Sequence, residues 1–179
     1  MHCPKCTIEY LKPTKLEDGL PVMGCQKCEG ALLPLLYYRD WAERIDLAFD
    51  AQTEPDKVLT DSDTKTAISC PKCSRLMTKY LVSGSLSTRL DLCGNCDEAW
   101  LDGGEWQLLK SLELGSNLPR VFTEQWQRKA RSEETEIDRV NRLKKIVGEQ
   151  DSERAIEVKK WLSGNKNKAT ILHFLGLSD

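Results

Sequence analysis

The sequence predicts a small, metal-stabilised α+β protein, in which two tandem units of short antiparallel strands, each followed by a helix, precede an α-helical C-terminal module. Three observations carry this prediction. All 8 cysteines fall in C-x-x-C pairs, the two halves of that pattern are copies of each other, and the last third of the chain has helical periodicity. A chain of 179 residues has room for one ordinary domain or several small ones.

The cysteines form two matched quartets, spaced C-x2-C-x18-C-x2-C and C-x2-C-x19-C-x2-C. Both inner spacings are typical of a tetrathiolate zinc site, because two tight turns (knuckles) each supply two vertices of a tetrahedron. We therefore predict two structural Zn2+ ions, one for each quartet. The predicted ligands are Cys3, Cys6, Cys25 and Cys28 in the first site and Cys70, Cys73, Cys93 and Cys96 in the second.

The cysteine pattern also permits other uses of the thiols. Four disulfides would need an oxidising compartment, and the N-terminal stretch Met-His-Cys-Pro-Lys-Cys has no secretory-signal features. A redox or metal-storage role for the thiolates is a further alternative, although no βαβ pattern surrounds them. Iron in a rubredoxin-like site is the main rival to zinc, since tetrahedral sulfur coordination suits both metals.

The two quartets belong to an internal repeat. Cys3-Pro4-Lys5-Cys6 recurs as Cys70-Pro71-Lys72-Cys73, and Ala31-Leu32-Leu33 beyond the last cysteine aligns with Ala99-Trp100-Leu101. Each copy therefore has the same predicted structure, two knuckles joined by short antiparallel strands. In the second copy, apolar residues alternate with polar ones from Leu86 to Leu92, which predicts a half-buried strand.

A helix is predicted after each quartet, over about residues 36–49 in the first copy, with Pro34 near its start. In the second copy the helix runs from Asp102 towards Leu114, with Asp102 as N-cap and Glu105 in the capping-box position. A catalytic acid/base role for these two carboxylates needs more assumptions than a capped helix. We expect Asp102→Ala to cost about 1 kcal/mol, as a lost cap.

These elements divide the chain into 1–50 (first zinc ribbon and helix), 51–69 (linker), 70–116 (second zinc ribbon and helix) and 117–179 (helical region). The last region is predicted to hold a helix over Arg120–Val147 ended by Gly148, a helix capped by Asp151 and Ser152, and a short helix near 168–175. We expect their apolar faces to pack into a small helical hairpin, with docking of a partner as the alternative.

The second copy resembles the bacterial transcription factor IIB-type zinc-ribbon proteins, whose pattern is C-P-x-C followed by C-x-x-C-x-G-x-W-L-D-x-G-E. It matches from Cys93 to Glu105 except that Glu98 stands where the family has Gly. The first copy keeps its four cysteines and Gly30, but has Leu32-Leu33-Pro34 in place of Trp-Leu-Asp. The resemblance implies two tandem zinc ribbons and an association with transcription, and it implies no defined activity.

Charge and composition exclude several classes of function. The mean hydropathy is −0.48, and no apolar stretch approaches the ~20 residues of a membrane helix; we predict a cytoplasmic protein with no membrane partner. The formal charge of −2 falls to about −6 when two zinc tetrathiolates form, which disfavours a strongly basic nucleic-acid binder. We expect Lys5, Lys27 and Lys72 to compensate thiolate charge locally.

No catalytic motif is present: the sequence has no Gly-rich phosphate loop, no G-x-S-x-G and no H-E-x-x-H. We therefore predict a non-enzymatic protein-interaction or regulatory adaptor with an unidentified protein partner. The predicted partner contacts are Leu35, Leu36 and Tyr37, because this apolar run needs cover from another surface. The alternative is a nucleic-acid-binding, transcription-related regulator.

Overall fold

The computed structural model describes residues 1–45 and 66–176 of the chain. Most of the predicted linker, and the predicted first helix beyond residue 45, lie outside the described residues. The chain forms two compact units, Met1–Glu134 and Thr135–Asp179, and both cysteine quartets belong to the first of them. No helix in the described part of the chain is long and apolar enough to cross a membrane.

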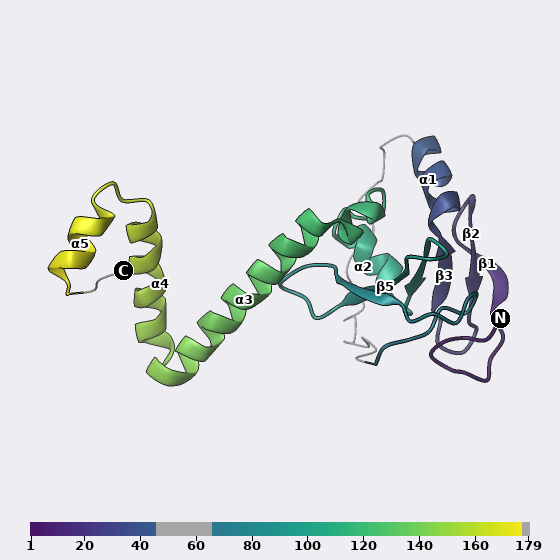
Figure 1. Cartoon of the computed structure of the whole chain (residues 1–179), viewed down its shortest axis with the longest axis horizontal. Helices are drawn as coiled ribbons and strands as arrows, with labels where there is room; N and C mark the ends of the chain where they lie inside the picture. The colour runs from purple at the N-terminus through teal and green to yellow at the C-terminus, as the bar shows by residue number, and fades with distance from the viewer. Residues whose placement is uncertain (46–65, 177–179) are drawn as a thin grey trace. The chain divides into compact units, whose positions relative to one another are not determined.

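The N-terminal unit is built on one six-stranded antiparallel sheet, to which each repeat contributes three strands (Figure 1). The strands are β1 (Lys12–Glu17), β2 (Leu20–Gly24) and β3 (Ala31–Pro34) from the first repeat, and β4 (Thr78–Leu81), β5 (Arg89–Cys93) and β6 (Glu98–Leu101) from the second. Their order is β1-β2-β3-β6-β5-β4, so the third strands of the two repeats pair at the centre. The α+β class predicted from the sequence is confirmed.

The pairing of β3 with β6 relates the two repeats by a local two-fold axis. Leu32 lies directly opposite Trp100, its counterpart in the second repeat, and the two strands are antiparallel. Each repeat also has the same internal register, since Met23 pairs with Leu32 and Asp91 pairs with Trp100. The sequence repeat is therefore a structural repeat, and its two copies share a single sheet.

Each face of this sheet supports its own buried cluster, because successive side chains on a strand point to opposite faces. On β3 and β6, Leu33 and Leu101 belong to a cluster that also contains side chains of the neighbouring helices. Leu32 and Trp100 belong to a second cluster that contains the cysteines. The cysteines thus lie on the sheet face opposite the cluster that contains the helices' side chains.

The helices largely follow the sequence prediction. They are α1 (Leu35–Arg44), α2 (Glu105–Ser111), the 3-10 helix η1 (Leu118–Phe122), α3 (Glu124–Val147), α4 (Glu149–Ser163) and α5 (Lys168–Phe174). Gly148, with φ +84, both ends α3 as predicted and stands at the N-cap of α4. The prediction that Asp151 and Ser152 cap this helix is wrong, because they lie within its first turn.

The alternation predicted along β5 is wrong in one respect. Leu90 is buried as predicted, but Asp91 is buried as well, although the pattern places it on a solvent-facing side. The Asp91 carboxylate accepts a hydrogen bond from the Lys79 ammonium at 2.9 Å on neighbouring β4. A carboxylate can be buried on this face because the positively charged Lys79 lies beside it and forms an ion pair with it.

The C-terminal unit does not bury its apolar residues as the sequence predicts. In residues 135–176, Ser152 is the one buried residue that the structure describes, while Trp161 is 55% exposed and Phe174 is 86% exposed. A contact between α3 and α4 is ionic, from Lys159 to Glu136 at 2.5 Å. A unit of this size has too little apolar surface to form a core of its own.

Candidate metal centres

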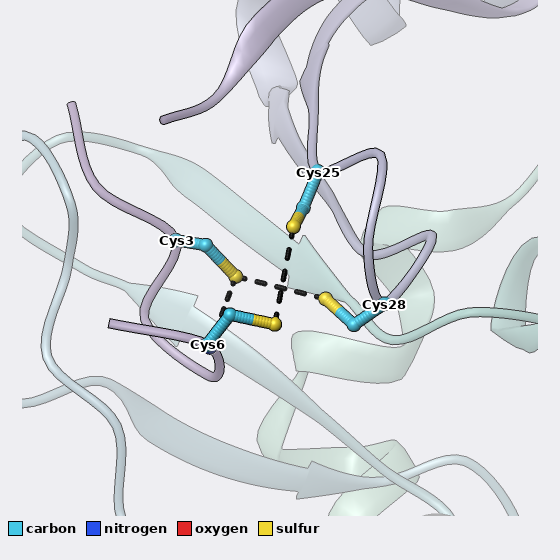
Figure 2. Close-up of side chains that lie close together, drawn as sticks. All are labelled: Cys3, Cys6, Cys25 and Cys28. Carbon is cyan, nitrogen blue, oxygen red and sulfur yellow. Dashed lines mark hydrogen bonds between the residues drawn. The ribbon is translucent and has the colours of Figure 1, made fainter. Parts of the chain in front are cut away.

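The first cysteine quartet forms a compact group of four sulfurs. Cys3, Cys6, Cys25 and Cys28 place their Sγ atoms within 4.8 Å of one another, and Figure 2 shows the four side chains converging from two separate turns. The Sγ atoms of Cys3 and Cys28 are 3.6 Å apart, and those of Cys6 and Cys25 are 4.0 Å apart. A tetrahedral ion with bonds of about 2.3 Å needs sulfurs about 3.8 Å apart, so the group fits a metal ion such as Zn2+.

The second quartet repeats this arrangement with Cys70, Cys73, Cys93 and Cys96, again within 4.8 Å. The Sγ atoms of Cys73 and Cys93 are 3.5 Å apart. In every knuckle the first cysteine is buried and the second is half-buried. All eight are free thiols in the structure, and these separations are far longer than a disulfide bond of about 2.05 Å.

All four knuckles share the same backbone hydrogen bond and the same left-handed turn residue. The residue after each second cysteine donates its N–H to the carbonyl of the first cysteine, at 2.8–2.9 Å. Each of these residues has a left-handed conformation, with φ between 55° and 61°: Thr7, Glu29, Ser74 and Asp97. This turn reverses the chain directly after the second ligand, which brings both sulfurs of a knuckle to the same side. None of the four is Gly, so each knuckle carries some backbone strain.

The thiols within a site differ in acidity when no metal is bound. Burial raises the pKa of Cys25, but hydrogen bonds, led by that from the backbone N–H of Cys28, outweigh this effect and hold the pKa at about 7. Burial raises the pKa of Cys28 far above its usual range. In the second site the N–H of Arg75 lowers the pKa of Cys73 to about 7, and burial raises that of Cys70 to about 12. A metal ion must displace the remaining protons, so binding strengthens as pH rises.

Asp102 has a different role from the predicted helix cap. The N-cap of α2 is Gly104, with φ 91. Glu105 does behave as a capping-box residue, because its carboxylate accepts the backbone N–H of Asp102 at 2.7 Å. The Asp102 side chain instead accepts the Trp100 indole N–H at 2.9 Å and the Lys5 ammonium at 3.1 Å. It therefore connects the second repeat to a knuckle of the first site.

The corresponding lysine of the second repeat, Lys72, finds its partner within its own repeat. Its ammonium donates to Glu98 at 2.6 Å, and Glu98 lies opposite Pro34 at the end of the β3–β6 pairing. The hydrogen bond to Glu98 raises the pKa of Lys72, and the charges of Glu98, Cys96 and Cys70 raise it further. The main partner of Lys72 is therefore Glu98 rather than the cysteine charge that we expected it to compensate.

The predicted partner contacts are distributed over both sides of α1. Leu35 is 2% exposed and belongs to the cluster between the sheet and the helices. Leu36 and Tyr37 are 68% and 53% exposed. Of the apolar run singled out in the sequence, these last two are the side chains that a partner can reach.

Sequence reasoning missed two close packings between the repeats. A Cβ on Gly30 would lie 2.4 Å from Cζ2 of Trp100, and one on Gly103 would lie 2.7 Å from the carbonyl oxygen of Cys28. The signal for the first was Gly30 itself, a glycine two residues after Cys28, where the second repeat has Glu98. Comparisons with protein-family models, with curated proteins and with solved structures find no match for this chain.

Proposed function

We propose that this chain is a non-catalytic zinc-binding protein with two zinc ribbons, acting as a protein-interaction or regulatory adaptor. The observation that carries the zinc assignment is the closed donor set of each centre. Four cysteine sulfurs complete a tetrahedron and leave no position for water or substrate, which is the arrangement of structural rather than catalytic zinc. Eight free thiols also suit a reducing compartment such as the cytoplasm.

Metal analysis of the purified chain tests the zinc assignment. We expect two zinc ions per chain, no visible absorbance, and loss of folded structure when a strong chelator removes the metal. A coloured ferric protein would replace zinc by iron. A folded chain that binds no metal under reducing conditions would refute the assignment altogether.

The adaptor role rests on the exposed apolar pair Leu36 and Tyr37 on α1. The test is capture of partner proteins from lysate with Leu36→Ser/Tyr37→Ser, compared with the matched control Tyr10→Ser/Leu76→Ser. The control residues are equally exposed apolar side chains, at 63% and 72%. We expect only the α1 variant to lose the partner, and unchanged capture by this variant would refute the proposed contact.

A second candidate function is nucleic-acid binding in transcription, which the family resemblance suggests. The observation in its favour is a stretch of the C-terminal unit without acidic side chains, from Val158 to Gly176. Within it, Trp161 and Phe174 are exposed, as are Lys160, Lys166 and Lys168. Lys159 is exposed as well but pairs with Glu136. Lysines for phosphates and aromatic rings for bases are the groups that bind single strands. Binding to DNA or RNA that weakens steeply with salt would support this function, and no binding at low salt would exclude it.

A further inference from the structure

Side chains of the second repeat extend to the first metal site. Asp102, 6% exposed, accepts the Lys5 ammonium at 3.1 Å, and Lys5 lies in the knuckle between the ligands Cys3 and Cys6. The other carboxylate oxygen of Asp102 accepts the Trp100 indole N–H at 2.9 Å. One carboxylate thus ties the first knuckle of site one to the central strand β6.

The second knuckle of site one is held by close packing against the same stretch. Gly30, two residues after the ligand Cys28, is covered by the Trp100 ring so tightly that a methyl group at this position would lie 2.4 Å from it. Gly103 packs equally closely against the carbonyl oxygen of Cys28, which would lie 2.7 Å from a Cβ at this position. Both knuckles of the first site therefore depend on where β6 and the turn after it lie.

The position of β6 depends in turn on the second metal site. Cys93 pairs with Glu98 where β5 meets β6, and Asp97 joins the ligand Cys96 directly to β6. The carbonyl of Asp97 accepts the backbone N–H of Leu35 at 3.0 Å. A metal ion that fixes Cys93 and Cys96 thereby fixes the start of the strand that carries Trp100.

We propose that the two tetrathiolate sites load metal cooperatively and that Asp102 is the positioning residue that couples them. This inference rests on the proposed function, since it requires both sites to bind zinc. An ion at either site orders β6 and the residues around it, so a second ion has less of the chain left to order. Because coupling between binding sites is reciprocal, either site filled first strengthens the other.

The coupling contact has no mirror image across the local two-fold axis. Pro34 stands at the position equivalent to Asp102 and has no carboxylate for Lys72, which pairs with Glu98 of its own repeat. In the other direction, Arg39 of the first repeat pairs with Asp97, beside Cys96 of the second site, at 2.7 Å. The ionic link from the second repeat to the first site runs through Asp102 and Lys5. A single substitution is enough to test it.

Native mass spectrometry of the full chain, with one equivalent of Zn2+ added to the apoprotein under reducing conditions, measures the coupling. Independent sites give at least half of the chains with one metal ion. Cooperative loading with a coupling of about tenfold lowers the one-metal species to about a quarter. A one-metal fraction of half or more in the wild type overturns the proposal, whereas failure to reach two ions with excess zinc overturns the proposed function.

Asp102→Asn tests the positioning role, because the amide oxygen can still accept the Trp100 indole N–H but can no longer form an ion pair with Lys5. We expect two ions to bind at excess zinc, with the one-metal fraction at one equivalent rising from about a quarter towards one half, since the packing at Gly30 and Gly103 remains. The matched control is Asp40→Asn, which removes an exposed ion pair to Arg44 within α1 and should leave the fraction at its wild-type value. If Asp102→Asn fails to fold, Lys5→Gln removes the same pair from its exposed end. A wild-type one-metal fraction in the folded variant refutes the role of Asp102.

Discussion

The two repeats have the same cysteine knuckles but different residues beyond them. Both place a left-handed residue after each second cysteine, and both pair their second and third strands in the same register. They differ where the third strand ends, since the second repeat has Trp100 and Asp102 at the positions of Leu32 and Pro34. The comparison shows that the repeated residues form the cysteine groups and the strand pairing at the centre of the sheet. The residues that differ, Trp100 and Asp102, make the side-chain contacts from the second repeat to the first cysteine group.

The differences between the two repeats are linked to each other in space. The first repeat lacks the Asp that would reach Lys72, and the second repeat has Glu98 where the first repeat has Gly30. Glu98 lies directly opposite Pro34 and supplies the carboxylate that is missing there. The lysine in the first knuckle of each repeat therefore has an acidic partner, Asp102 for Lys5 and Glu98 for Lys72. The two partners occupy different positions within the second repeat.

Loss of a ligand should produce the largest effect and should distinguish the repeats. Cys93→Ser removes one vertex of the second site, and a structural zinc site contributes about 10–16 kcal/mol, comparable to the whole stability of a small domain. We expect bound zinc to fall from two ions to one and the Trp100 indole N–H resonance to lose its native position. The matched Cys25→Ser should also bind one ion while perturbing that resonance less. Two retained ions in Cys93→Ser would contradict the ligand assignment.

Asp102→Ala should cost about 3 kcal/mol in unfolding free energy, well above the 1 kcal/mol expected of a helix cap. The substitution removes the acceptor of two hydrogen bonds and leaves the Trp100 indole N–H buried without it. Urea denaturation of the zinc-loaded chain measures the difference. A loss near 1 kcal/mol would mean that the carboxylate contributes little to joining the repeats.

Gly30→Ala should destabilise the protein by about 2 kcal/mol, because the added methyl group collides with the buried Trp100 ring. Gly94→Ala is the matched control in a knuckle of the second repeat, where a Cβ would meet no atom within 4 Å. Thermal unfolding of the two zinc-loaded variants tests this difference. Equal melting temperatures would show that the ring moves aside freely.

Ser74→Gly should have the smallest effect and the opposite sign, a stabilisation of about 1 kcal/mol. Ser74 is exposed and left-handed, with φ 61, a conformation that Gly adopts without strain. The control is Ser87→Gly, at an exposed position outside the left-handed region, where added backbone freedom should destabilise the protein slightly. A lower midpoint for Ser74→Gly in urea would contradict the strain assigned to the knuckle.

The grouping of the eight cysteines into two sets of four could be predicted from the sequence, whereas the contacts between the two sets could not. Cysteine spacing is a local property, because a C-x-x-C turn and its hairpin return their ligands to one point whatever surrounds them. The partner of Asp102, by contrast, lies 97 residues away at Lys5. A local pattern, Asp followed three residues later by Glu, suggested a helix cap there, and the long-range ion pair overrode it.

The repeat, the two tetrathiolate quartets and the helical character of the last third follow from patterns that extend over a few residues to a few turns. That the two copies share one sheet depends on β3 meeting β6, and strand pairing across 68 residues leaves no periodic trace in a chain. The same holds for buried Asp91, which an alternating pattern places in solvent until Lys79 and the metal-side cluster cover it. Local chemistry determines which ligands form a site, and the pairing of distant strands determines which site supports which.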